Sequence, residues 1–119
     1  FPSDPYLVHI RALNELLNRS STSIGVERIK NTIDVFTYLS AHTILLHYPV
    51  FRATVSNKIV QLRQEMEDKK KEAIDTFVSV YSPDGNNWYK KHTLLNARDV
   101  LYYAPLLEVE LKKVESLIH

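Results

Sequence analysis

NNWYKKHTLLNARDVLYYAPLLE, which runs from Asn86 to Glu108, is the most distinctive part of this sequence. It follows the clearest break in the chain, Ser82-Pro83-Asp84-Gly85, and it contains the only tryptophan. Aromatic rings and cations alternate along it. Because rings stack on bases and cations pair with phosphates, this mixture favours a nucleotide or nucleic-acid site. The alternative is a corner between helices whose rings close the hydrophobic core.

Outside this stretch the composition predicts an all-α protein. The chain has 119 residues, enough for one domain with a single core, and we expect that domain to cover residues 1–119. Only two residues are glycine, which argues against the many tight turns of an all-β fold. The net charge is +1, so binding to a polyanion would need a local basic patch.

Apolar residues at helical spacing predict a bundle of about five helices. Asp4-Pro5 and Pro49 are good helix starts, and Pro105 should open the last helix because proline disrupts a helix interior. The third helix either continues to Tyr81 or bends near its charged segment. The predicted helices cover residues 5–19, 24–46, 49–81, 88–95 and 105–118.

Two polar features lie on these predicted helices. The cluster Ser20-Ser21-Thr22-Ser23 should cap the start of the second helix, with phosphate binding as the alternative. Arg28 lies one turn inside that start, where a cation opposes the helix dipole, so Glu27 or a ligand phosphate should lie nearby. The simpler alternative is a solvated arginine.

The charged segment 65–72 in the third helix mixes both signs. Such segments mark solvated helix surfaces, here with expected pairs Glu65–Lys69 and Glu67–Lys71. A helix of this length should project beyond a compact bundle, and projecting ends tend to contact partners.

Several classes of function lack their usual sequence signals. There is no cysteine, and His42 and His47 are five residues apart, so we expect no metal and no cofactor. The chain has no Asp-x-Asp pair, glycine-rich phosphate loop or His-Glu-x-x-His motif, which favours a binding module over an enzyme. No apolar segment is long enough to cross a membrane, so we expect a cytoplasmic protein without membrane contact.

Three segments, taken in order, resemble a known family. They are Phe1-Pro2-Ser3-Asp4, Asn96-Ala97-Arg98 and Tyr103-Ala104-Pro105-Leu106-Leu107-Glu108. Together they are similar to the C-terminal domain of the large subunit of archaeal and eukaryotic DNA primase. In that family, cysteines at the positions of Asp4 and Glu108 hold an iron–sulfur cluster. The chain therefore resembles a cluster-free relative, most like the small third subunit of crenarchaeal primases.

The resemblance implies specific site residues and partners. Arg28 corresponds to an arginine that opens the second helix of the family, and Asn96 and Arg98 correspond to its Asn-x-Arg segment. We add Trp88, Lys91 and His92 on chemistry alone, as a stacking ring, a cation and a hydrogen-bond donor. The implied partners are the catalytic and large primase subunits, a nucleoside triphosphate and a single-stranded DNA template.

The predicted function is therefore a non-catalytic accessory subunit of the primosome, in archaeal DNA replication. It would bind the initiating nucleotide and template while RNA primer synthesis begins. One alternative is a small helical nucleic-acid-binding subunit of a CRISPR effector complex, which should have a spread-out basic face. Another is a structural protein-interaction bundle, which should make no nucleotide contact.

Overall fold

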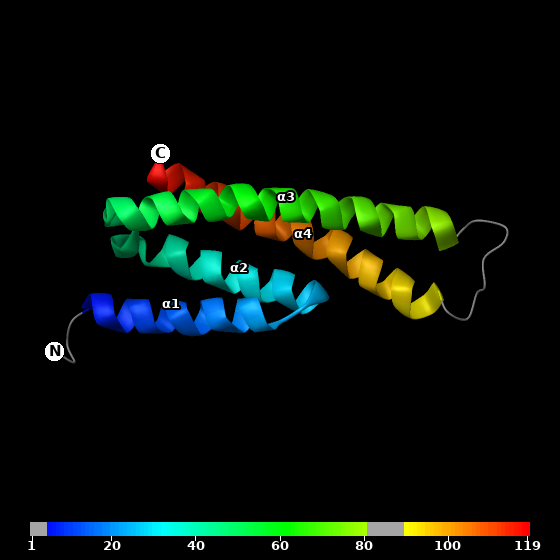
Figure 1. Ribbon diagram of the computed structural model, residues 1–119, viewed down its shortest axis with the longest axis horizontal. Helices are drawn as coiled ribbons and strands as arrows, with labels where there is room; N and C mark the ends of the chain where they lie inside the picture. The colour runs from blue at the N-terminus through cyan, green and yellow to red at the C-terminus, as the bar shows by residue number, and fades with distance from the viewer. Residues whose placement is uncertain (1–4, 81–89) are drawn as a thin grey trace.

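The computed structural model describes residues 5–80 and 90–119, and all the regular structure in these two ranges is helical (Figure 1). The elements are α1 (Pro5–Thr22), α2 (Gly25–Ala41), a 3-10 helix η1 (Thr43–His47), α3 (Pro49–Val80) and α4 (Lys90–Ile118). The expected all-helical fold is confirmed. None of the described helices carries an apolar segment that could span a bilayer.

The helices form an elongated domain of 63 × 28 × 17 Å. α1 and α3 run in one direction, and α2 and α4 run in the other (Figure 1). α4 packs closely against both α2 and α3, and α2 packs closely against α1, whereas the α1 and α3 backbones do not approach each other. The end of α3 and the start of α4 extend beyond α1 and α2, as expected for so long a third helix (Figure 1).

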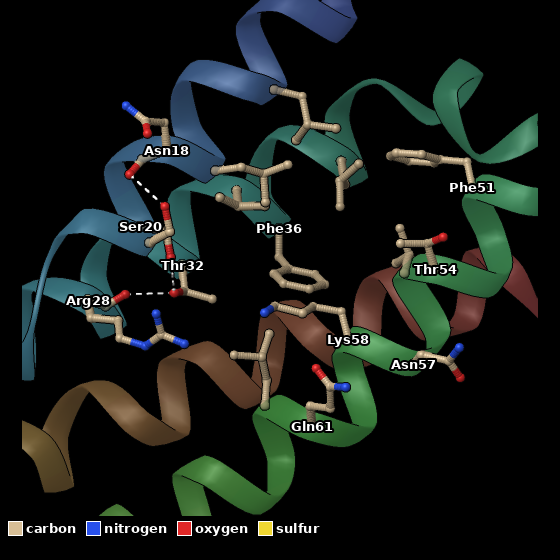
Figure 2. Close-up of a pocket in the computed structure, with 17 residues that line it drawn as sticks. Asn18, Ser20, Arg28, Thr32, Phe36, Phe51, Thr54, Asn57, Lys58 and Gln61 are labelled. Carbon is tan, nitrogen blue, oxygen red and sulfur yellow. Dashed lines mark hydrogen bonds between the residues drawn. The ribbon is translucent and has the colours of Figure 1, made fainter.

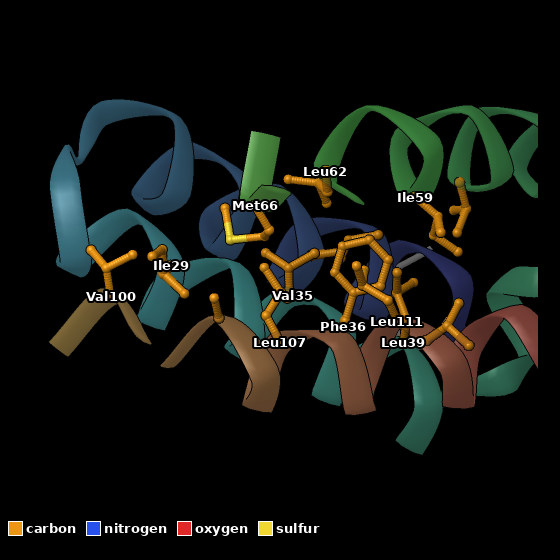
Figure 3. Packing of buried hydrophobic residues seen from close by; sticks show 14 of the residues in the cluster. Ile29, Val35, Phe36, Leu39, Ile59, Leu62, Met66, Val100, Leu107 and Leu111 are labelled. Carbon is orange, nitrogen blue, oxygen red and sulfur yellow. The ribbon is translucent and has the colours of Figure 1, made fainter. Parts of the chain in front are cut away.

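The core lies where side chains of α2, α3 and α4 meet (Figure 3). Ile29 and Leu39 of α2, Ile59 of α3, and Leu107 and Leu111 of α4 are almost completely buried. Burying one such side chain contributes about 1.5–3 kcal/mol, so these residues supply much of the free energy of folding.

The turn between α1 and α2 differs from the sequence prediction. The serine cluster does not cap α2, because Ser20, Ser21 and Thr22 belong to α1 and Ile24 occupies the N-cap position of α2 without a side-chain cap. Hydroxyls of this cluster donate to carbonyls at the end of α1, as in the 2.9 Å bond from Ser23 to the Ser20 oxygen. Gly25 then begins α2 with φ +61°, a conformation that glycine adopts without steric cost.

The second helix is also shorter than predicted. It ends at Ala41, and residues 43–47 form η1 instead of continuing α2 to residue 46. The tighter 3-10 turn buries Leu45 and Leu46 while the chain reverses before Pro49. The apolar residues keep their helical spacing through this reversal, so the sequence pattern did not reveal where the second helix ends.

Pro105 was the largest error in the predicted boundaries. Two helices were expected around it, but α4 is one continuous helix with Pro105 in its interior. The proline ring lies on the exposed side, where water can solvate the Leu101 carbonyl that loses its helical hydrogen bond. On the opposite side Ala104 and Leu107 are buried, and their packing holds the helix together.

This arrangement predicts that Pro105→Ala stabilises the protein. Removing the proline restores a helical hydrogen bond, and the gain should exceed the extra entropy of the unfolded chain, leaving about 1–2 kcal/mol. Thermal unfolding followed by circular dichroism should show a Tm several degrees higher. Pro49→Ala is the matched control, because Pro49 is the first residue of α3 and should give no such gain. A lower Tm for Pro105→Ala would mean that packing requires a proline-induced bend.

A two-pronged ion pair joins α3 to α4. The Arg63 guanidinium donates to Glu108 from Nε at 3.0 Å and to Glu115 from Nη1 at 2.5 Å. Glu108 and Glu115 are seven residues apart and therefore lie on one face of α4. The hydrogen bond that Arg63 donates to Glu115 raises the pKa of Arg63 and lowers the pKa of Glu115 below its ordinary 4.5.

The lowered pKa of Glu115 gives the stability of the protein an acid dependence. Its contribution should be fully present above the pKa of the unfolded chain and lost as pH falls through the lower folded value. Glu115→Gln should therefore lower Tm modestly at pH 7, and the difference from the parent should vanish once the pH falls below the lowered pKa of Glu115 in the folded protein.

Glu72→Gln is the control for this comparison. Glu72 is an exposed α3 glutamate whose carboxylate makes no ion pair among the described residues. A Tm difference for Glu115→Gln that is the same at every pH would contradict the assignment to the Arg63 pair.

Candidate ligand groove between α1, α2 and α3

One concave feature of the described chain is a groove between α1 and α3, with α2 as its floor (Figure 2). It exists because α1 and α3 do not pack closely on each other, and it encloses about 490 Å³. That volume is within the range of pockets that hold small organic ligands. Its lining combines an apolar floor with polar side chains from all three helices: Leu13, Leu17, Asn18, Ser20, Ser21, Arg28, Thr32, Val35, Phe36, Leu39, Phe51, Thr54, Val55, Asn57, Lys58, Gln61 and Leu62.

One end of the groove is polar and the other is aromatic (Figure 2). At the polar end Thr32 donates to the Arg28 carbonyl oxygen at 2.7 Å, and the Ser20 and Thr32 hydroxyl oxygens are 2.7 Å apart. Since the single Thr32 proton is used by Arg28, Ser20 must donate to Thr32. Phe51 lies at the far end, and Phe36 lies between the two ends (Figure 2).

Arg28 meets a different anion from the one expected. Its guanidinium donates from Nε and Nη2 to Glu65 of α3, at 2.9 and 3.2 Å, rather than to Glu27. The hydrogen bond to Glu65 raises the pKa of Arg28 above its ordinary value. The expected pairs of Glu65 with Lys69 and of Glu67 with Lys71 are therefore wrong, because Glu67 pairs with Lys70.

The side-on geometry of this pair leaves part of the guanidinium available. Arg28 Nη1 makes no hydrogen bond in the described part of the chain. Lys58 reaches from α3 across the groove in the direction of Arg28 (Figure 2), and its ammonium forms no ion pair with the described residues. The groove lining contains these two cations and no carboxylate, but Glu65 already pairs with Arg28, so the charge that favours an anionic ligand is that of Lys58.

The other predicted site residues do not line this groove. Asn96 and Arg98 lie on regular helix in α4, where positions two apart point about 200° away from each other. Both are exposed, and Arg98 pairs with Asp99 at 3.1 Å. His92 is exposed in the first turn of α4. Asn96 and Arg98 therefore cannot clamp one small ligand between them.

For two of the nominated residues, the structure gives little or no information on their placement. Trp88 lies outside the described residues, and for Lys91 only its place in the first turn of α4 is described. Farther along α4, the Tyr103 ring is half-buried with the Lys30 ammonium 4.8 Å from its centre, whereas Tyr102 is exposed. The aromatic residues that follow Val100 thus divide between the core edge and the surface.

The sequence reasoning missed Lys58 and Phe51. Phe51, Thr54, Val55, Lys58 and Leu62 recur every three or four residues and so share one face of α3. A lysine between Val55 and Leu62 on a largely apolar helical face is the signal that could have indicated this site.

Across the described residues, no three or more His, Asp or Glu side chains gather in a way that could hold a metal ion. Comparison of the chain with protein-family models, curated proteins and solved structures finds no match.

The buried hydroxyl pair at the polar end predicts a measurable effect on stability. Thr32→Val keeps the side-chain shape but leaves the buried Ser20 hydroxyl without its acceptor, which should cost about 1–3 kcal/mol. Urea unfolding should show a lower midpoint with an unchanged slope. Thr54→Val is the control, because that hydroxyl is exposed and, in the described part of the chain, bonds only the Val50 carbonyl of its own helix. Equal stability of the two variants would contradict the interpretation of the Ser20–Thr32 bond.

Proposed function

We propose that this chain is a non-catalytic accessory protein of a DNA primase, and that it resembles the family's iron–sulfur domain without the cluster. In this role it binds the initiating nucleoside triphosphate and the single-stranded template beside the catalytic and large subunits. The resemblance supplies the biological setting. The observation that carries the nucleotide role is that Arg28, matched to the family by position, lines a groove with Lys58 and no carboxylate.

The groove offers suitable chemistry for each part of a nucleotide. Arg28 and Lys58 would pair with the phosphates, because charge-assisted hydrogen bonds are the strongest that proteins form. Phe36 and Phe51 provide apolar ring surface for the base, and Asn57 and Gln61 provide amide groups that discriminate among base edges. Holding one nucleotide in place makes bond formation with the second effectively intramolecular.

The first turns of α4 are the proposed template contact. All three of His92, Asn96 and Arg98 are exposed there: His92 and Asn96, four residues apart, share one face of the helix, and Arg98 lies on another. A strand that winds past a helix can reach several of its faces, whereas a single nucleotide cannot. Glu108, which the resemblance aligns with a cluster ligand, is engaged by Arg63, and Asp4 lies outside the described residues.

A protein-interaction bundle is the second candidate, and the Arg28–Glu65 pair favours it. A guanidinium that already holds α2 to α3 has a structural role and needs no ligand. Substituting Arg28 and Glu65 in separate variants distinguishes the two functions.

The nucleotide proposal predicts opposite effects of two neutralising substitutions. Arg28→Gln should weaken nucleoside triphosphate binding and de novo initiation about 10- to 150-fold, by the usual strength of a charge-assisted contact. Glu65→Gln removes the competing carboxylate and should leave binding equal or tighter. Lys58→Ala should weaken binding about 10-fold.

Binding is measured by calorimetry, and initiation is measured in the complex reconstituted with the catalytic and large subunits. Extension of a preformed primer should stay near normal. Lys70→Ala is the control, because the one ion pair of Lys70 within residues 5–80 and 90–119 is with the exposed Glu67. If Arg28→Gln and Glu65→Gln lower Tm alike and neither changes binding, the pair is structural and the nucleotide role is wrong.

A further inference from the structure

A second apolar surface lies on α4, on the side away from the core. Ala97, Val100, Ala104, Leu107, Leu111 and Val114 are buried along one side of this helix. Five large apolar residues on roughly the opposite side are between 39% and 62% exposed: Leu95, Tyr102, Leu106, Val109 and Leu117. We call these five residues the outer stripe. A helix that is apolar on two sides is normally covered on both.

The spacing within the outer stripe is that of a helix-packing seam. Its members are separated by seven, four, three and eight residues, close to the 3.5-residue repeat of paired helices. Asp99 and Lys113 occupy two further positions on the same side of α4. Among the described residues, each forms an ion pair only with a neighbour in its own helix, Asp99 with Arg98 and Lys113 with Glu110.

Four positions on this side of α4 are placed symmetrically about Leu106, and their symmetry indicates which partner covers the outer stripe. Leu95 and Leu117 both lie eleven residues from Leu106, and Asp99 and Lys113 both lie seven residues from it. Two copies of α4 that cross antiparallel at Leu106 would therefore place each Asp99 beside the Lys113 of the other copy. They would also place each Leu95 beside the other Leu117. A parallel arrangement would bring Asp99 against Asp99 and Lys113 against Lys113, which repel.

We propose that this protein forms a two-fold symmetric dimer through the outer stripe, with antiparallel α4 helices whose axis passes at Leu106. Ten large apolar side chains, five from each copy, become covered, and two Asp99–Lys113 pairs fix the direction and register. The contact is isologous, so it closes at two copies and leaves no stripe exposed for further growth. The inference rests on α4 alone and is independent of the primase proposal.

Sedimentation equilibrium of the full chain tests the dimer directly, and twice the mass of one chain is expected. Leu106→Lys places two like charges at the axis and should weaken dimerisation about 30-fold or more. Val60→Lys is the matched control, because Val60 is 66% exposed on α3 and outside the stripe. A monomer at all accessible concentrations overturns the proposal, as does a dimer that Leu106→Lys leaves intact while it remains folded.

Charge reversal tests the register. Asp99→Lys alone should weaken the dimer about 10-fold by setting lysine against Lys113, and the double variant Asp99→Lys with Lys113→Asp should restore it. Absence of restoration overturns the proposed pairing.

Cross-linking tests the direction, and it is clean because the chain has no native cysteine. In a mixture of Leu95→Cys and Leu117→Cys proteins, oxidation should give mainly the mixed disulfide between the two variants. Disulfides that join only like variants would show a parallel contact and overturn the antiparallel arrangement.

Discussion

The packing of α4 against α2 and α3 is the contact on which the rest of the structure depends. Among the described helices, α1 packs closely only on α2 and η1, and α3 packs closely only on α4 and η1, so α4 links the two halves of the chain. Leu107, Leu111 and Val114 have no exposed surface and supply that link. The same connectivity leaves α1 and α3 apart, and that separation creates the groove. The candidate site therefore exists because the bundle does not close between α1 and α3.

Two arginines then fix α3 relative to its neighbours. Arg28 of α2 pairs with Glu65, and Arg63 pairs with Glu108 and Glu115 of α4, so α3 is tied to both central helices within one turn of its own length. These pairs are partly exposed, and exposed pairs contribute about 0–1 kcal/mol each. Their larger effect is on register, because sliding α3 by one turn along α4 would separate Arg63 from at least one of its two carboxylates.

The sequence predicted what depends on local pattern and missed what depends on tertiary packing. Helical periodicity and the scarcity of glycine predicted the all-α fold, and the length of the third helix predicted its projecting end. Pro105 was misinterpreted because proline propensity is local, whereas the burial of Ala104 and Leu107 that overrides it is not. Similarly, Arg28 was expected near an anion, but that anion is Glu65, 37 residues away. The nomination of Asn96 and Arg98 came from the resemblance, and the continuous helix α4 places their side chains on opposite sides.

The groove and the outer stripe are formed by different residues, so a ligand and a second copy of the chain could bind at the same time. No residue of α4 lines the groove, so a contact through the outer face of α4 would leave the groove open in each copy. Conversely, ligand phosphates at Arg28 and Lys58 would contact α2 and α3 and would not touch the stripe. What connects the two surfaces is the core face of α4, whose packing on α2 positions Ile29, one residue from Arg28. A change in how α4 packs would therefore reach the groove through α2, whereas a change confined to the outer stripe would not.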